Sequence, residues 1–147
     1  MNIYLDHNAT SPLLPEVLEK MGPWLGTPAN PSSAHHFGQR ATVAVEDARI
    51  HVAALVGGSP AGVIFTSGAT EANHTFLRGC PNVGTVAVSE IEHPCVLDAV
   101  SRMSAVVLPI EVGADGRMGS IPNADLIVMM AANHETGVVQ PITETRR

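Results

Sequence analysis

The stretch of residues 63–71 reads V-I-F-T-S-G-A-T-E, and it predicts both a fold class and a binding chemistry. Its first three residues favour a β-strand, the next three break that pattern, and a helix-forming stretch begins at Ala69. A strand-to-helix turn of this kind presents free backbone N–H groups and the positive end of a helix dipole. Gly68 and Ala69 leave open space, and Thr70 adds a hydroxyl donor. The turn therefore predicts a phosphate-binding pocket, the alternative being an ordinary turn with a good helix start.

Short apolar runs and helical stretches continue to alternate along the chain. In chain order the sequence predicts a helix at 15–24, a helix at 33–55, a strand at 63–65, a helix at 69–77, a strand at 85–88, a helix at 94–103, and strands at 105–110 and 126–131. The strands lack polar alternation, as in parallel sheets that have helices on both faces. This order predicts an α/β fold, here a partial three-layer, mostly parallel sheet. A further helix is expected to begin at Pro141.

Composition restricts the partners of the chain. Of its 147 residues 45% are hydrophobic and 15% charged, which is typical of a globular protein. The net charge of −6 disfavours nucleic acid and anionic membranes as partners. The N-terminus has no secretory signal pattern, and the apolar run at 126–132 is far below the ~18 residues of a membrane span. Cys80 and Cys95 are expected to be reduced thiols in the cytoplasm.

Two more polar turns follow predicted strands. His93 precedes Pro94, which fits the first position of a helix, so a neutral imidazole is expected at the carboxyl end of the strand 85–88. The second turn is N-H-E-T-G at 133–137, after the strand 126–131. No H-E-x-x-H or Cys/His spacing typical of a metal site occurs, and neither does a dinucleotide or P-loop motif. We expect no metal, and we expect the three turns to converge on one site.

Five segments, taken together, resemble the motifs of one family in its own order. They are Y-L-D-H-N-A-T-S-P at 4–12, N-P-S-S-A-H at 30–35, F-T-S-G-A-T-E at 65–71, E-H at 92–93 and N-H-E-T-G-V-V-Q-P at 133–141. The family is the cysteine desulfurases, pyridoxal-phosphate enzymes of the class-V aminotransferase group. The resemblance implies the aspartate aminotransferase-like large domain, with 1–14 as an N-terminal segment and 15–147 as an incomplete cofactor-binding domain.

The resemblance also implies an activity and a site. The family converts L-cysteine to L-alanine and transfers the sulfur to an enzyme cysteine as a persulfide, for iron–sulfur clusters or thio-modification. By resemblance the cofactor pyridoxal 5'-phosphate is bound by Ala69, Thr70, His93 and His134, the catalytic residue is His93, and substrate is bound by Asn8, Asn30 and His35. A sulfur-acceptor or scaffold protein and a homodimer of the full-length form are the implied partners.

Two departures from the family pattern affect this reading. His134 occupies a position at which the family has asparagine, and Lys20, outside every motif, is the single lysine of the 147 residues. The lysine that binds the cofactor and the cysteine that takes the sulfur are expected beyond residue 147, so the chain is expected to be an N-terminal part that is inactive alone. The alternatives are another class-V enzyme, such as a selenocysteine lyase or an aminotransferase, and a lysine-free non-catalytic protein. The latter would bind a phosphorylated ligand or pair with a full-length desulfurase.

Overall fold

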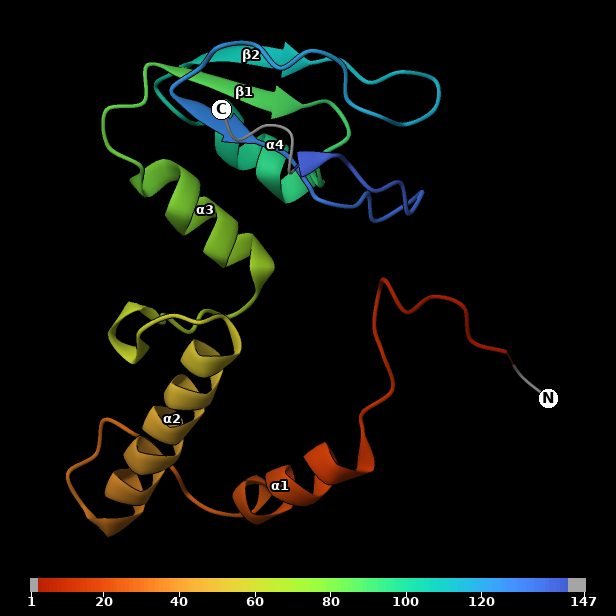
Figure 1. Cartoon of the computed structure of the whole chain (residues 1–147). Coiled ribbons are helices and arrows are strands. Elements are labelled where there is room, and N and C mark those ends of the chain that lie inside the picture. The colour runs from red at the N-terminus through yellow and green to blue at the C-terminus, as the bar shows by residue number, and fades with distance from the viewer. Residues whose placement is uncertain (1–2, 143–147) are drawn as a thin grey trace. The chain divides into compact units, whose positions relative to one another are not determined.

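A computed structural model describes residues 3–142, and the chain divides into two compact units, Met1–Phe65 and Thr66–Arg147. The first unit is helical. The second contains helices and a parallel sheet, which confirms the predicted α/β fold class (Figure 1). The structure contains no helix, within residues 3–142, that is long and apolar enough to span a membrane.

The first unit has two α-helices, α1 (Pro15–Leu25) and α2 (His36–Leu55), and the short 3₁₀ helix η1 (Pro60–Gly62). The predicted helices at 15–24 and 33–55 are therefore confirmed, although α2 begins later than predicted. The reason is His35, whose extended backbone and side chain form the cap of α2. Its Nδ1 accepts a hydrogen bond from the Gly38 N–H at 3.3 Å, so the helix starts after it.

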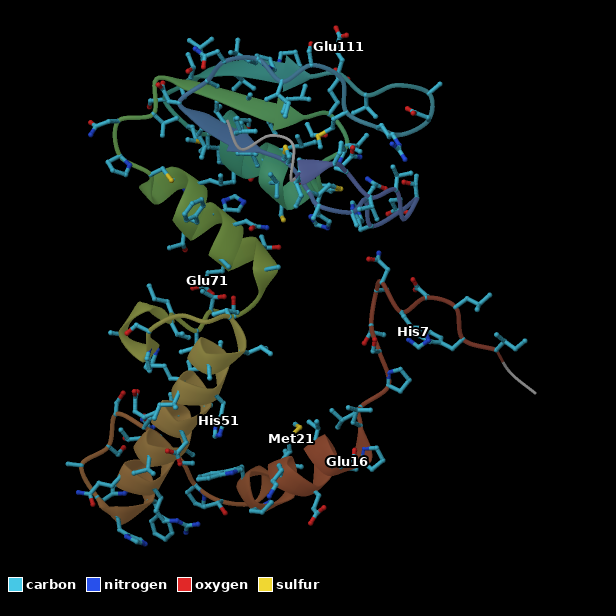
Figure 2. All side chains as sticks on the ribbon, viewed as in Figure 1. His7, Glu16, Met21, His51, Glu71 and Glu111 are labelled. Carbon is cyan, nitrogen blue, oxygen red and sulfur yellow. The ribbon has the colours of Figure 1, made fainter. Side chains whose placement is uncertain are left out.

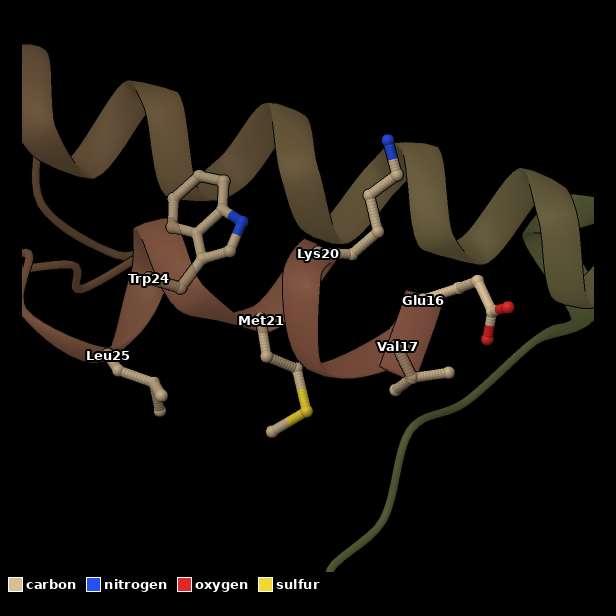
Figure 3. A pocket seen from close by; sticks show the side chains of 6 residues that line it. All are labelled: Glu16, Val17, Lys20, Met21, Trp24 and Leu25. Atoms are coloured by element: carbon tan, nitrogen blue, oxygen red, sulfur yellow. The ribbon is translucent and has the colours of Figure 1, made fainter. Parts of the chain in front are cut away.

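Helix α1 buries none of its side chains. Figure 3 shows Val17, Met21 and Leu25 along one side of this helix and Trp24 on another. The Arg40 guanidinium of α2 lies over the Trp24 ring, 6.0 Å from its centroid. The hollow in Figure 3 is lined by α1 alone, so it is the surface of one helix rather than a pocket between elements.

The predicted strand at 63–65 is wrong, because the structure has no strand there. A strand needs a neighbouring strand to receive its backbone hydrogen bonds. Here the Val63 carbonyl accepts a hydrogen bond from the Arg49 guanidinium of α2, which also lies 5.1 Å from the centroid of the Phe65 ring. Ile64 is 78% exposed. An arginine side chain thus occupies the place of a strand partner.

The second unit alternates helices and strands. Its elements are α3 (Ala69–Gly79), β1 (Thr85–Ser89), α4 (Pro94–Ser101), β2 (Val106–Ile110) and β3 (Leu126–Val128). The three strands are parallel in the order β2-β1-β3. The strand predicted at 126–131 is shorter than expected, because its pairing with β1 ends where Val88 pairs with Val128. The following residues then enter a hairpin closed by the bridge between Ala132 and Val139.

The core of this unit lies between the sheet and the helices α3 and α4. Both helices lie on the same side of the sheet in Figure 1. Its buried members are Leu77, Val86, Val88, Val96, Ala99 and Val100. The prediction of helices on both faces is not met within the described residues, since Ile127 on the opposite face is 44% exposed. This core fixes the carboxyl ends of β1 and β3, where the candidate site lies.

Asp125 joins the amino-terminal ends of β1 and β3 by hydrogen bonds. Asp125 Oδ2 accepts hydrogen bonds from the N–H groups of Gly84 and Thr85 at 3.0 and 2.8 Å, and from Thr85 Oγ1 at 3.0 Å. These bonds hold the pKa of Asp125 below its usual value, the backbone bond of Thr85 first among them. The helix predicted from Pro141 onward falls largely on 143–147, outside the described residues.

Candidate functional site

The first part of the site is the turn that begins α3. Gly68 is extended, with φ 164° and ψ −178°, and a side chain added there would meet no atom within 4 Å. The Ser67 N–H donates a hydrogen bond to Glu71 Oε2 at 2.6 Å, which turns the carboxylate back toward the chain preceding the helix. Hydrogen bonds from Ser67 hold the pKa of Glu71 below its usual value. Figure 2 shows Glu71 at the start of α3.

Ala69 and Thr70 form the exposed first turn of this 11-residue helix. The first four N–H groups of an α-helix have no partner within the helix, and the helix dipole is positive at this end. The open space at Gly68 gives an anion access to them. The predicted strand-to-helix turn is thus present only as an exposed helix start, and its role in binding phosphate stays a prediction.

His93 is the cap of α4. Its backbone is extended, with φ −60° and ψ 142°, and Pro94 occupies the first helical position as predicted. Nδ1 of His93 accepts a hydrogen bond from the Cys95 N–H at 3.1 Å, and the Cys95 sulfur lies 3.0 Å from the same nitrogen. The cap fixes the imidazole at the carboxyl end of β1.

His134 lies opposite His93. Their ring centroids are 5.2 Å apart and the rings are inclined at 54°. His134 Nε2 is 3.6 Å from Glu135 Oε1, a carboxylate on the exposed rim. Two of the predicted turns, separated by about forty residues of sequence, thus meet at one edge of the sheet.

Asn133 shapes the loop that carries His134. Its Oδ1 accepts hydrogen bonds from the N–H groups of Glu135 and Thr136 at 3.0 and 2.8 Å, and its Nδ2 donates to the Ile91 carbonyl at 3.2 Å. The side chain is buried. One amide therefore closes the 133–137 loop and ties it to the residues after β1. No role was predicted for Asn133, although asparagine is the usual residue in such self-closing turns.

A second buried amide ties this loop to its neighbour. Gln140 Oε1 accepts from the Met118 N–H at 3.0 Å, and its Nε2 donates to the Gly116 carbonyl at 2.8 Å. Gln140 thereby joins the hairpin closed by Val112 and Met118 to the end of the 133–139 hairpin. Nothing in the local sequence pattern indicated this contact.

Beside the two histidines lies a cavity of about 400 Å³. It is lined by Ile91, Glu92, Pro94, Gly116, Asn133, His134, Glu135 and Thr136. Glu92 is 8% exposed, and burial raises the pKa of its carboxyl above the usual value, against the opposing effects of backbone hydrogen bonds and both histidines. Its Oε1 has no hydrogen-bond partner among the described residues. Glu92 belongs to the E-H motif at 92–93, and its burial was not predicted.

Helix α3 packs on α4 close to this site. Asn73 Nδ2 donates to the Cys95 sulfur at 3.4 Å, and His74 Nε2 lies 3.4 Å from Asp98 Oδ2. Asn73 is one turn after Thr70 on the helix, so the start of α3 lies about one turn from the cap of α4. Ala69 and Thr70 do not line the cavity itself.

The residues predicted to bind substrate belong to the first unit. Asn8 is in an exposed turn, Asn30 Oδ1 accepts a hydrogen bond from the Ser32 N–H at 2.9 Å, and His35 caps α2. These contacts are local to the first unit, and the role of each residue in substrate binding stays a prediction. Across residues 3–142 the structure gathers no three His, Cys, Asp or Glu side chains as a metal site.

The fold and the site together define an α/β protein in which two histidines lie at the carboxyl end of a parallel sheet and an exposed helix start packs close by. The model of the aminotransferase class-V family matches residues 3–147. The chain belongs to the class-V aminotransferase family.

Individual relatives and structures agree with this membership. The chain is 42% identical to a cysteine desulfurase of Frankia sp. (strain EuIK1), over 99% of this chain and 41% of the relative, and 38% identical to the cysteine desulfurase IscS of Dechloromonas aromatica, over 97% and 40%. A solved NifS-like protein has a TM-score of 0.85 at 31% identity, over 98% of this chain and 44% of that one. The NifS-like protein from Rickettsia africae has a TM-score of 0.80 at 29% identity. The chain therefore spans about two fifths of the length of these proteins.

Proposed function

We propose that this chain is the N-terminal part of a pyridoxal-phosphate-dependent cysteine desulfurase. The complete enzyme would convert L-cysteine to L-alanine and pass the sulfur to one of its own cysteines as a persulfide. The observation that carries the proposal is the His93–His134 ring pair, 5.2 Å between centroids, at the carboxyl end of the sheet. The relatives named cysteine desulfurase, which match 97–99% of the chain, support the same assignment.

The residues present fit the cofactor. The start of α3 offers N–H groups and open space at Gly68 for a phosphate. When bound, pyridoxal phosphate supplies the electron-accepting ring that this class of chemistry needs. Ala69 and Thr70 would bind the phosphate, the latter through its N–H and hydroxyl.

The two histidines would have different roles. The ring of His93, fixed by its cap, would stack on the pyridine ring and move a proton to or from the substrate. His134 would donate one hydrogen bond to the cofactor or substrate, as an amide does at the family position. Asn133 would act only indirectly, because it holds the loop on which His134 lies.

Other parts of the proposal concern the complete enzyme. Residues 15–147 would belong to its cofactor-binding domain, 1–14 would be an N-terminal segment, and Asn8, Asn30 and His35 would contribute to substrate binding. The protein would be a cytoplasmic homodimer that delivers sulfur to an acceptor or scaffold protein. The single lysine, Lys20, lies on α1, so the lysine that holds the cofactor would come from sequence after Arg147.

The test is binding of pyridoxal phosphate to the purified 147-residue chain, followed by fluorescence or equilibrium dialysis. Thr70→Val should weaken binding by about fivefold to tenfold, because one hydroxyl hydrogen bond to an anion is lost. Thr75→Val on the exposed side of the same helix is the matched control and should have no effect. Equal binding of pyridoxal without phosphate, or equal effects of the two variants, would refute the phosphate site.

The second candidate is a non-catalytic protein that binds a phosphorylated ligand or pairs with a full-length desulfurase. A selenocysteine lyase or an aminotransferase of the same family is a further alternative. Adding a separately produced C-terminal segment of a desulfurase distinguishes these possibilities. Our proposal expects sulfide release from L-cysteine only in the mixture. Release by the 147-residue chain alone, or failure of the mixture with every amino-acid substrate, would contradict it.

A further inference from the structure

A buried glutamine closes the hairpin that carries His134. Gln140 is 3% exposed, and its backbone N–H donates a hydrogen bond to the Ala131 carbonyl at 2.8 Å. Further along the hairpin, the Asn133 N–H donates to the Val138 carbonyl at 2.9 Å. These two backbone bonds pair the arms of the hairpin, so the position of its base fixes the position of the loop with His134.

The side chain of Gln140 fastens this base to the hairpin that follows β2. Its Oε1 accepts from the Met118 N–H at 3.0 Å, and its Nε2 donates to the Gly116 carbonyl at 2.8 Å. Each of the two polar atoms of the buried amide therefore has a partner. Gly116 has a φ of 77°, and a Cβ added to it would lie 3.1 Å from Val138 Cγ2. The two hairpins thus lie in direct contact.

This contact joins the extensions of the two outer strands of the sheet. The strand order is β2-β1-β3, and both hairpins follow outer strands at the carboxyl edge (Figure 1). His93 comes from the turn after the central strand β1, and His134 comes from the hairpin after β3. Gln140 therefore links the outer strands at the edge where the two histidine rings face each other, with centroids 5.2 Å apart.

We infer that Gln140 is a positioning residue that holds His134 opposite His93 through the base of the hairpin. It acts through the hairpin rather than on a bound molecule, because its side chain is buried and both polar atoms are engaged. A glutamine that only stabilised the fold would lower stability without moving the rings. The consequence for cofactor or substrate binding rests on the proposed function, whereas the effect on the ring pair does not.

The experiment is proton NMR of the full 147-residue chain at a pH of about 8, above the usual histidine pKa. In the unaltered chain, nuclear Overhauser effects should connect the ring protons of His93 and His134. Gln140→Met keeps a similar side-chain volume but loses both hydrogen bonds. It should reduce these effects by about half or more while the amide shifts of β1 and α4 stay in place. Gln39→Met makes the same substitution at an exposed position of α2 and should leave them unchanged.

A second measurement needs no variant. The Met118 N–H is bonded to Gln140, and the Asn133 N–H is bonded within the hairpin of His134. If the two hairpins open together, native-state hydrogen exchange should protect these two amides to within about threefold. Protection that differs by more than about tenfold, or an unchanged ring contact in Gln140→Met, would overturn the inference. If Gln140→Met loses the dispersed spectrum of a folded protein, the exchange result decides.

Binding of pyridoxal phosphate to the same variants separates this inference from the proposed function. With His134 as a donor to the bound molecule, Gln140→Met should raise the dissociation constant by about threefold to tenfold, the effect of one hydrogen bond. An unaltered chain that does not bind the cofactor would contradict the proposed function. The ring contact and the exchange result would still decide the role of Gln140.

Discussion

The two units of the chain differ in where their apolar side chains lie. In the second unit, valines and leucine from α3, α4 and β1 form a buried cluster. The buried hydrophobic residues described in the first unit are two alanines, Ala41 and Ala53, while Ile50 and Leu55 on the same helix stay exposed. The helices of the first unit thus bury no large side chain, whereas the site of the second unit, whose parts are far apart in sequence, lies on a core.

The largest difference in free energy of unfolding is expected when one isoleucine in each unit is replaced by alanine. Ile110→Ala removes a side chain that is 0% exposed at the end of β2, and should lower the free energy of unfolding by about 2–5 kcal/mol. Ile50→Ala removes one that is 53% exposed on α2, and should cost less than about 1 kcal/mol. Urea denaturation followed by circular dichroism measures both. Equal losses would mean that α2 has a core of its own.

A smaller effect is expected at Gly38, where the backbone of Ser33 leaves no room for a side chain. A Cβ added to Gly38 would lie 2.0 Å from the Ser33 carbonyl oxygen, so Gly38→Ala should destabilise the start of α2 by about 1–3 kcal/mol. Gly22→Ala on α1 meets no atom within 4 Å and should instead stabilise its helix by about 0.5–1 kcal/mol. Hydrogen exchange of the amides in each helix tests the pair. The same sign for both substitutions would contradict the structure.

The smallest effects are those of pH on the second unit, and two carboxyls should act in opposite directions. The hydrogen bond from Arg102 lowers the pKa of Asp98, so its stabilising contribution is present above the usual aspartate pKa and is lost as pH falls through the lowered value. Burial raises the pKa of Glu92, so stability decreases as pH rises from the usual glutamate pKa through the raised value.

Urea midpoints measured across the acidic and neutral range check these signs. The unaltered chain should lose stability on both sides of a maximum. Glu92→Gln should keep the loss at low pH and remove the loss at higher pH, and Glu90→Gln should keep both. A Glu92→Gln curve identical to that of the unaltered chain would show that Glu92 is not buried as described.

Local patterns in the sequence predicted most helices and the three parallel strands, because helix caps and apolar runs depend on neighbouring residues. The strand at 63–65 was predicted wrongly, because a strand needs hydrogen bonds from a neighbouring strand. The Val63 carbonyl is instead hydrogen-bonded by the Arg49 side chain. The roles of Asn133 and Glu92 were missed for the same reason. The amide of Asn133 reaches Ile91, 42 residues away, and the burial of Glu92 depends on that loop. The periodicity of apolar residues along the sequence does not predict contacts between residues so far apart.

The cap at the start of α4 has a consequence for the chemistry of His93. Because Nδ1 accepts the Cys95 N–H, its lone pair is engaged, and the neutral ring carries its hydrogen on Nε2. His93 is therefore held as one tautomer by the same bond that begins the helix. In this tautomer Nε2–H is a hydrogen-bond donor, and the ring can accept a proton only at Nδ1, which requires the cap bond to the Cys95 N–H to open. The end of helix α4 thus couples proton uptake by His93 to the opening of its own cap.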